Sequence, residues 1–291
     1  MNQISEKDIV VLYHAGCTDG FSAAWAAWKK FGDKAAYVPM EWNKVPEGLI
    51  NKEIYTLDIS LPGSKIPELI STNKRVTSID HHESNEAATK ATQEYLFDRH
   101  HSGGVLAWNY FHPNAPMPRL LNYCEDMDFW RFPNEESQPI MMVVTALGTY
   151  EFEAWDGLAK DLEDDNFRHD YIKQGKLILQ MHNKTVDALL KDAQLIELSG
   201  HKVYSVNAPH FYASQVAGIL AEMHPPFGVV WVQEKDKIHV SLRSNNKAAQ
   251  IFDVSKIAQQ FGGGGHPASS GFVFPADAPM PWKIIRESNG K

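Results

Sequence analysis

The sequence has few cysteines, no long apolar run and no excess of basic residues, and each absence excludes a class of protein. Only Cys17 and Cys124 occur among 291 residues, so a disulfide-stapled secreted domain is not expected. No stretch approaches the ~20 consecutive apolar residues that a membrane-spanning helix requires. The first residues lack a basic segment followed by an apolar core, so no signal peptide is expected. These features predict a cytoplasmic protein.

The balance of charge disfavours a protein that binds long nucleic acid through a broad basic face. The chain has 36 acidic and 28 basic residues, and its formal net charge is −8. Tight binding of duplex nucleic acid depends on many lysine and arginine contacts to phosphates. A small phosphorylated ligand remains compatible with this composition, because bound divalent cations can supply positive charge locally.

The length and the order of apolar patterns predict two α/β domains. Short apolar runs alternate with helical patterns in the first half, which is typical of a parallel sheet covered on both faces. A long helical pattern at 166–193 predicts a linker. We therefore expect a parallel-sheet domain at 1–165 and a smaller α/β domain at 194–291, with the active site in the cleft between them.

The expected elements follow from apolar periodicity and from the positions of proline and glycine. In the first domain they are strands at 9–13, 35–38, 54–57 and 76–79 and helices at 18–31, 64–71, 103–111, 119–127 and 140–147. In the second domain they are strands at 202–206, 229–233, 237–242 and 271–274 and helices at 213–223 and 254–261. The strands at 229–233 and 237–242 are expected to form a hairpin.

Three of the predicted strands end in a residue that can bind a metal. These residues are His14, Asp58 and Asp80. The carboxyl ends of parallel strands meet at one edge of a sheet, so we expect these side chains to converge there. His81 and His82 follow directly, and Asp19 lies at the start of the next helix. A single such residue is more often a cap, but burying five or six without a metal would be costly.

Imidazoles together with carboxylates suit divalent ions of the manganese or zinc type. Several carboxylates that can bridge favour two ions over one, because a pair can clamp a phosphoryl group during in-line displacement. The sequence therefore indicates a metal-dependent reaction at phosphorus.

A second signal lies near the C-terminus, where four consecutive glycines precede His266. Glycines allow close approach of the backbone to a ligand and expose its N–H groups, so the run at 262–265 predicts a loop that binds phosphate or carboxylate. Arg243 ends a predicted strand upstream and offers a planar fork for a phosphate.

These motifs together resemble a known family. Asp80-His81-His82 after a strand resembles the signature of the DHH phosphoesterases. The segment at 262–272, preceded by Ser241–Ser244, resembles their DHH-associated C-terminal domain. The resemblance covers nearly the whole chain and is strongest to short bacterial and phage forms. These are similar to the oligoribonuclease branch, which degrades nano-RNA or cyclic-nucleotide-type diesters.

The resemblance implies a role for each matched residue. It implies two divalent ions, with manganese expected and zinc, iron or cobalt as alternatives. The implied metal ligands are His14, Asp19, Asp58, His81 and Asp126, with Asp128 as the alternate to Asp126. Asp80 and His82 are implied as catalytic residues, Asp80 holding the site together and His82 stabilising charge in the transition state. The implied phosphate-binding residues are Arg243, Gly264, Gly265, His266, Ser102 and Gly103.

The chain departs from the family pattern at one position. Many members have an Asp-x-Asp-Gly first motif, and here Cys17 stands where the first aspartate is expected. A thiolate ligand would shift the preference of the site toward zinc or iron. The alternative is a small buried cysteine packed under the helix.

The expected function is hydrolysis of phosphodiester bonds in short oligonucleotides by a hydroxide that two metals activate. One alternative is a phosphomonoesterase or pyrophosphatase that acts on small phosphorylated nucleotides. A second is a non-catalytic nucleotide-binding module, for which Cys17 is the support. The expected partner is a short single-stranded oligonucleotide or small nucleotide, and neither a membrane nor a stable protein partner is predicted.

Overall fold

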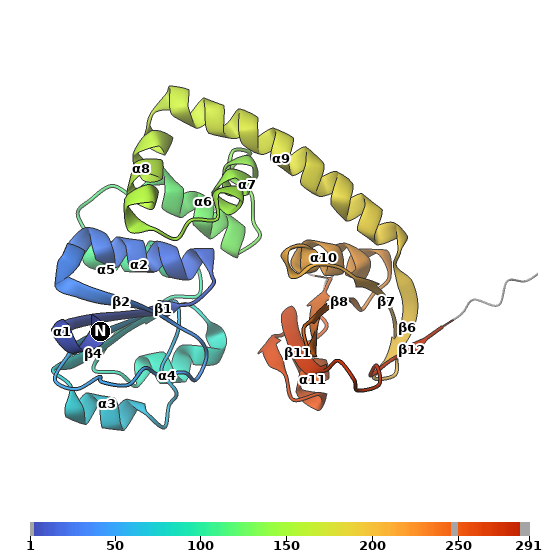
Figure 1. Ribbon diagram of the computed structural model, residues 1–291, viewed down its shortest axis with the longest axis horizontal. Coiled ribbons are helices and arrows are strands. Elements are labelled where there is room, and N and C mark those ends of the chain that lie inside the picture. The colour runs from blue at the N-terminus through green and yellow to red at the C-terminus, as the bar shows by residue number, and fades with distance from the viewer. Residues whose placement is uncertain (1–2, 246–249, 286–291) are drawn as a thin grey trace, which may run out of the picture. The chain divides into compact units, whose positions relative to one another are not determined.

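The computed structural model describes residues 3–245 and 250–285, and the chain divides into two compact units (Figure 1). The units are Met1–Leu179 and Gln180–Lys291. The division falls within helix α9 (Asp165–Lys191), inside the segment at 166–193 that the sequence indicates as a linker. No helix in the described ranges is long and apolar enough to cross a bilayer. The predicted α/β class is confirmed.

The first unit contains a five-stranded parallel sheet. Its strands are β1 (Ile9–His14), β2 (Ala35–Met40), β3 (Glu53–Leu57), β4 (Arg75–Asp80) and β5 (Glu94–Phe97). They lie in the order β2-β1-β3-β4-β5, and every neighbouring pair is parallel. Consecutive residues of β1, Val10 to Leu12, are fully buried, because helices cover both faces. β1, β3 and β4 are adjacent, so their carboxyl ends lie together.

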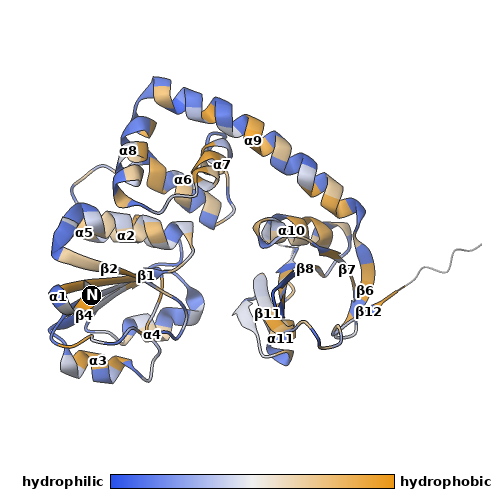
Figure 2. Ribbon diagram, viewed as in Figure 1, coloured by the Kyte–Doolittle hydropathy of each residue, from blue (hydrophilic) through white to orange (hydrophobic). Residues whose placement is uncertain are grey.

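Two helical layers sandwich this sheet (Figure 1). On one face lie α2 (Thr18–Phe31) and α5 (Gly103–Phe111), and on the other lie α1 (Gln3–Glu6), α3 (Ile66–Thr72) and α4 (Glu86–Lys90). Trp25 of α2 and Trp108 of α5 are both buried on the first face. Figure 2 shows apolar residues along the central strands and mixed colours along the helices, as expected for covered strands and amphipathic helices.

Three further helices extend the first core. They are α6 (Arg119–Asp128), α7 (Ser137–Leu147) and α8 (Phe152–Glu163). α6 packs against α2, α5, α7 and α8. The buried Trp155 of α8 meets Phe21 of α2 edge to face, with ring centroids 5.0 Å apart. This packing fixes the end of α6 relative to the start of α2.

The second unit is built on a seven-stranded mixed sheet in the order β10-β11-β9-β8-β7-β6-β12. The strands are β6 (Gln194–Leu198), β7 (His201–Asn207), β8 (Phe227–Glu234), β9 (Lys237–Ser244), β10 (Gly264–His266), β11 (Ser269–Pro275) and β12 (Lys283–Ile284). β8 and β9 form the predicted antiparallel hairpin. α10 (Ala213–Met223) covers one face and α11 (Ser255–Gln260) the other.

The glycine run at 262–265 is only partly a loop. Its last two residues begin the edge strand β10, which pairs with β11. Gly265 has a φ of 136°, and a Cβ atom there would lie 2.6 Å from the Ser269 carbonyl oxygen. Glycine is therefore required at this position by the turn between two strands.

Candidate metal centre

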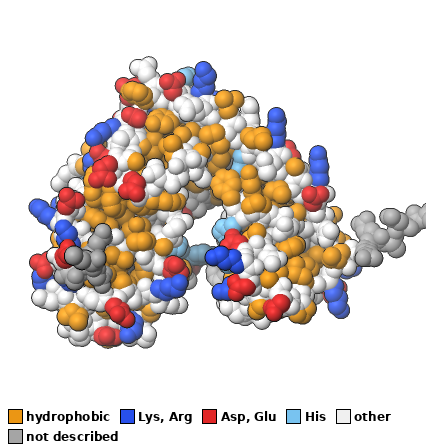
Figure 3. All heavy atoms as spheres, viewed as in Figure 1, with side chains coloured by type: hydrophobic (Ala, Val, Ile, Leu, Met, Phe, Trp, Pro, Cys, Tyr) orange, Lys and Arg blue, Asp and Glu red, His pale blue; other side chains and the backbone are white. Residues whose placement is uncertain are grey.

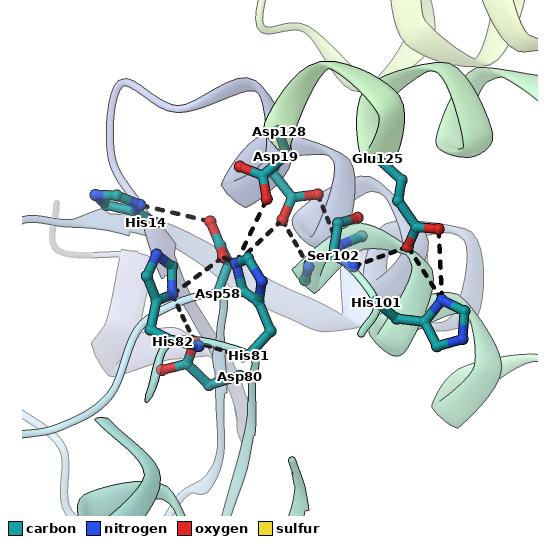
Figure 4. Close-up of polar contacts among 12 residues, drawn as sticks. His14, Asp19, Asp58, Asp80, His81, His82, His101, Ser102, Glu125 and Asp128 are labelled. Atoms are coloured by element: carbon teal, nitrogen blue, oxygen red, sulfur yellow. Dashed lines mark hydrogen bonds and ion pairs between the residues drawn. The ribbon is translucent and has the colours of Figure 1, made fainter. Parts of the chain in front are cut away.

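Asp58 occupies the middle of the sheet edge formed by the ends of β1, β3 and β4 (Figure 4). Its φ is 58°, a left-handed conformation that residues other than glycine seldom adopt. Its amide donates to the Ile79 carbonyl at 2.9 Å, which anchors the strained residue to β4. The side chain is 1% exposed. Strain of this kind is typical of functional sites, where the fold directs a side chain to a fixed position.

The Asp58 carboxylate has no hydrogen-bond partner among the described residues. His14 Nδ1 lies 3.4 Å from one oxygen and His81 Nε2 lies 3.2 Å from the other, but neither contact has hydrogen-bond geometry. Both nitrogens also lack a hydrogen-bond partner in the described chain. Burial acts to raise the pKa of Asp58, but His14 and His81 outweigh it and hold the pKa below its usual value. Unpartnered buried polar atoms of this kind are costly unless another group binds them.

The N-terminus of α5 holds Asp19 in place. The Gly103 amide donates to Asp19 Oδ2 at 2.6 Å, and the Gly104 amide donates to Oδ1 at 3.0 Å. Free N–H groups in the first turn of a helix bind anions well. The Asp19 Oδ2 atom lies 4.0 Å from His81 Nε2, so this interaction places the carboxylate beside the imidazole.

The same turn corrects the prediction for Ser102 and Gly103. The sequence predicts that both bind the substrate phosphate, but their amides are already used by the protein's own carboxylates. The Ser102 amide donates to Glu125 Oε2 at 2.8 Å, and the Gly103 amide donates to Asp19. The anion at this helix N-terminus is therefore part of the protein, and the turn positions metal-binding groups.

Asp80 forms hydrogen bonds that hold the neighbouring residues in place. Its Oδ1 atom accepts hydrogen bonds from the amides of His81 at 2.8 Å and His82 at 3.1 Å, and it lies 2.8 Å from His82 Nδ1. Its Oδ2 atom accepts from Asn85 Nδ2 at 2.7 Å. Although Asp80 lies within reach of the metal-binding cluster, both oxygens are engaged. Asp80 is therefore a positioning residue that orients His82. No pattern in the sequence marked Asn85, its buried partner.

Besides the group of Asp58, Asp80, His81 and His82, two groups of potential ligands lie at this edge, and Asp58 belongs to one of them; Figure 4 labels all of these residues except Cys17. In the first, donor atoms of His14, Cys17 and Asp58 all lie within 4.8 Å of one another, and in the second the same holds for Asp19, His81 and Asp128. Asp58 also contacts His81 of the second group at 3.2 Å. Nitrogen, oxygen and sulfur donors that converge around unpartnered buried atoms fit divalent metal ions.

The structure places Asp128, and not Asp126, in this cluster. Asp128 Oδ2 lies 3.7 Å from His81 Nε2, whereas the carboxylate of Asp126 accepts a hydrogen bond from the Ser137 hydroxyl. Residues two apart on a helix are rotated by about 200° from each other, so only one of the pair faces the sheet edge. Asp128 is the last residue of α6, which directs it to that edge.

The carboxylates of these ligand groups carry more negative charge than the neighbouring histidines neutralise. Burial raises the pKa of Asp19 well above its usual range, and Asp58 and Asp128 raise it further. Burial also raises the pKa of Asp128 to about 6. Burial lowers the pKa of His81, but the nearby Asp58 carboxylate outweighs it and the pKa rises to about 9. Divalent cations would remove this mutual repulsion.

Replacing Asp128 with asparagine is expected to stabilise the metal-free protein at pH 7. The folded-state pKa of about 6 lies above the usual 3.8, so ionising Asp128 destabilises the fold as pH rises from about 4 to about 6. Asp128→Asn removes this penalty, and it also removes a ligand. The Tm without metal should rise, and the gain in Tm on adding Mn²⁺ should shrink.

The neighbouring Asp126 provides the control. Asp126→Asn keeps an oxygen for Ser137 and lies outside the cluster, so its gain in Tm with Mn²⁺ should match that of the wild type. Equal gains in the wild type and in Asp128→Asn would exclude Asp128 as a ligand.

The second unit brings two predicted phosphate-binding residues, Arg243 and His266, onto strands that flank β11. Arg243 on β9 is opposite Ser269 on β11, which is in turn opposite His266 on β10, so the three share a face of the sheet. Arg243 donates through Nη2 to the Ser214 hydroxyl at 2.8 Å. Burial lowers the pKa of Arg243 to about 10, which leaves it charged at neutral pH. No described carboxylate pairs with it, so this guanidinium is able to bind an anion.

Comparisons with known proteins agree with this architecture. Residues 205–280 match the DHHA1 domain family. A DHH domain described as a member of a family of ribosomal proteins has a similar fold, with a TM-score of 0.59 at 13% identity over 94% of this chain and 84% of that one. The second unit therefore carries a DHHA1 domain, and the whole chain has the fold of a DHH-domain protein.

Two further similar proteins span most of the length of this chain. An exopolyphosphatase-related protein from Bacteroides fragilis has a TM-score of 0.53 at 13% identity, covering 96% of this chain and 90% of that one. The uncharacterized protein R106 of Acanthamoeba polyphaga mimivirus is 28% identical over 302 residues, which cover 94% of this chain and 69% of the relative. The structural similarities, at this low identity, show the fold alone.

Proposed function

We propose that this protein is a divalent-metal-dependent phosphoesterase of the DHH type that hydrolyses phosphodiester bonds of short oligonucleotides or related nucleotides. The observation that carries the proposal is the buried Asp58 carboxylate. Its oxygens lack hydrogen-bond partners in the described chain, and potential metal ligands surround it. Neither the unpartnered carboxylate nor the left-handed backbone conformation of Asp58 stabilises the fold. A site for two cations explains both features.

The proposed chemistry divides between the ions and the protein. Two divalent ions, when bound, supply an activated water and neutralise charge on the phosphoryl group. His14, Cys17, Asp19, Asp58, His81 and Asp128 would hold them. Burial lowers the pKa of His82, but its contact with Asp80 outweighs this and raises the pKa. A protonated His82, oriented by Asp80, is suited to donate to a phosphoryl oxygen as charge develops there.

The proposed substrate is small, and the second unit contains residues that suit a phosphate. The half-buried Arg243 lacks a described carboxylate partner, and His266 shares its face of the sheet. Acidic and basic side chains alternate over the visible surface without a broad basic face (Figure 3). With a net charge of −8, this surface favours a short ligand over a long duplex.

The test is hydrolysis of a panel of substrates with added Mn²⁺ or Co²⁺ and after chelation. The panel contains a dinucleotide RNA, a longer oligomer, a cyclic dinucleotide, a bisphosphorylated nucleoside and pyrophosphate. We expect metal-dependent release of mononucleotides from the dinucleotide, abolished by chelation. Release of inorganic phosphate alone would indicate a phosphomonoesterase or pyrophosphatase. No turnover of any substrate by metal-loaded protein would contradict the proposed activity.

A further inference from the structure

The two cysteines of the chain lie in opposite environments. Cys124 is 2% exposed and belongs to the large apolar core of the first unit. Cys17 lies between β1 and α2 and belongs to none of the hydrophobic clusters of the described chain. It occupies the N-cap position of α2, yet its side chain makes no capping hydrogen bond. Packing therefore accounts for Cys124 and does not account for Cys17.

The Cys17 sulfur faces donor atoms that need a partner. It lies within 4.8 Å of a His14 nitrogen and of an Asp58 carboxylate oxygen, and these two atoms also lie within 4.8 Å of each other. His14 Nδ1 and both Asp58 oxygens are buried and lack a hydrogen-bond partner among the described residues. Asp58 itself is 1% exposed, so it is shielded from bulk solvent. The thiol, the imidazole and the carboxylate thus form a group of donors that can bind a single cation.

The two groups of ligands differ in chemical character. His14, Cys17 and Asp58 offer one nitrogen, one sulfur and one oxygen donor, whereas Asp19, His81 and Asp128 offer one nitrogen and two carboxylates. Soft thiolate ligands favour Zn²⁺, Fe²⁺ and Co²⁺ over Mn²⁺, whereas carboxylates suit Mn²⁺ well. The difference between the groups comes from a single side chain, Cys17.

We propose that Cys17 is a metal ligand and that the His14–Cys17–Asp58 position selects a thiophilic divalent ion, while the Asp19–His81–Asp128 position accepts Mn²⁺. The two positions of this site are therefore unequal in metal preference. The inference rests on the metal centre of the proposed function and is independent of the substrate. Its test accordingly needs a binding signal that turnover does not influence.

The test is a titration of the metal-free, full-length protein with Co²⁺, followed by absorbance. A thiolate bound to Co²⁺ gives an intense charge-transfer band in the near ultraviolet, which nitrogen and oxygen ligands do not give. We expect this band in the wild type and in Cys124→Ala, and its loss in Cys17→Ser. Cys17→Asp should bind Co²⁺ without the band, and its preference for Zn²⁺ over Mn²⁺ should fall at least about tenfold.

The outcomes separate this inference from the proposed function. A band in the wild type that disappears in Cys17→Ser supports the inference even when no substrate of the panel is hydrolysed. Cobalt bound without the band, or a band that survives in Cys17→Ser, overturns it and leaves the proposed activity standing. Failure to bind any Co²⁺ overturns both. Far-ultraviolet circular dichroism of each variant establishes that the fold is retained.

Discussion

Asp58→Asn is expected to lower metal-dependent turnover by at least about a thousandfold, equivalent to ~4 kcal/mol of transition-state stabilisation. Asp58 belongs to one group of ligands and contacts His81 of the other, so its loss weakens both cation positions. Asparagine has nearly the same shape and tolerates the left-handed φ of 58° that the position requires. The fold should therefore persist, and kcat/KM at saturating metal measures the effect.

Asp98→Asn is the matched control for this variant. Asp98 follows β5 at the same edge of the sheet, but it accepts a hydrogen bond from the His100 amide and lies outside the ligand groups. Its removal should leave turnover within about twofold of the wild type, as is usual for a partly exposed residue outside the site. Wild-type turnover in metal-loaded Asp58→Asn would remove the basis for the proposed centre.

Gly103→Ala is expected to impair the metal centre, although Gly103 is not itself a ligand. A Cβ atom on Gly103 would lie 2.6 Å from Asp58 Cβ, 2.9 Å from Asp58 Oδ1 and 3.0 Å from Asp19 Oδ2. Both carboxylates are buried and short, so they cannot move aside without shifting the backbone. We expect a loss of about 1–3 kcal/mol in the free energy of unfolding and a fall of at least about a hundredfold in turnover.

Helix propensity alone predicts the opposite result, which makes this variant informative. Alanine in place of glycine stabilises a helix by about 1 kcal/mol where space permits. A Cβ atom on Gly157 of α8 would meet no other atom within 4 Å, so Gly157→Ala should be neutral or stabilising. An active Gly103→Ala protein with a raised Tm would show that the carboxylates are not confined as the structure indicates.

The convergence of His14, Asp58 and Asp80 at one edge of the sheet was predictable, because the ends of strands can be recognised in the sequence. An apolar run followed at once by His14, Asp58 or Asp80 places the residue at the carboxyl edge of a parallel sheet, whatever the order of the strands. The position of Asp58 between two ligand groups depends on β1, β3 and β4 being adjacent. That adjacency comes from the tertiary fold and is not encoded in any local pattern.

Positions that depend on helix rotation or on distant partners were not predicted. Asp126 and Asp128 are both plausible ligands until the end of α6 is oriented by its packing, which selects Asp128. The turn at Ser102 and Gly103 was recognisable as an anion site, but its anion, Asp19, lies 84 residues from Gly103 in the chain. Short elements such as β5 and β10 offer too few residues for a periodic pattern.

The most direct test of the account is an anomalous difference map from crystals of the full-length protein grown with Co²⁺. The account predicts two peaks at the carboxyl edge of the first sheet, one bounded by His14, Cys17 and Asp58 and the other by Asp19, His81 and Asp128. A map without peaks at this edge, from protein shown to contain cobalt, would contradict the metal centre and the phosphoesterase built on it.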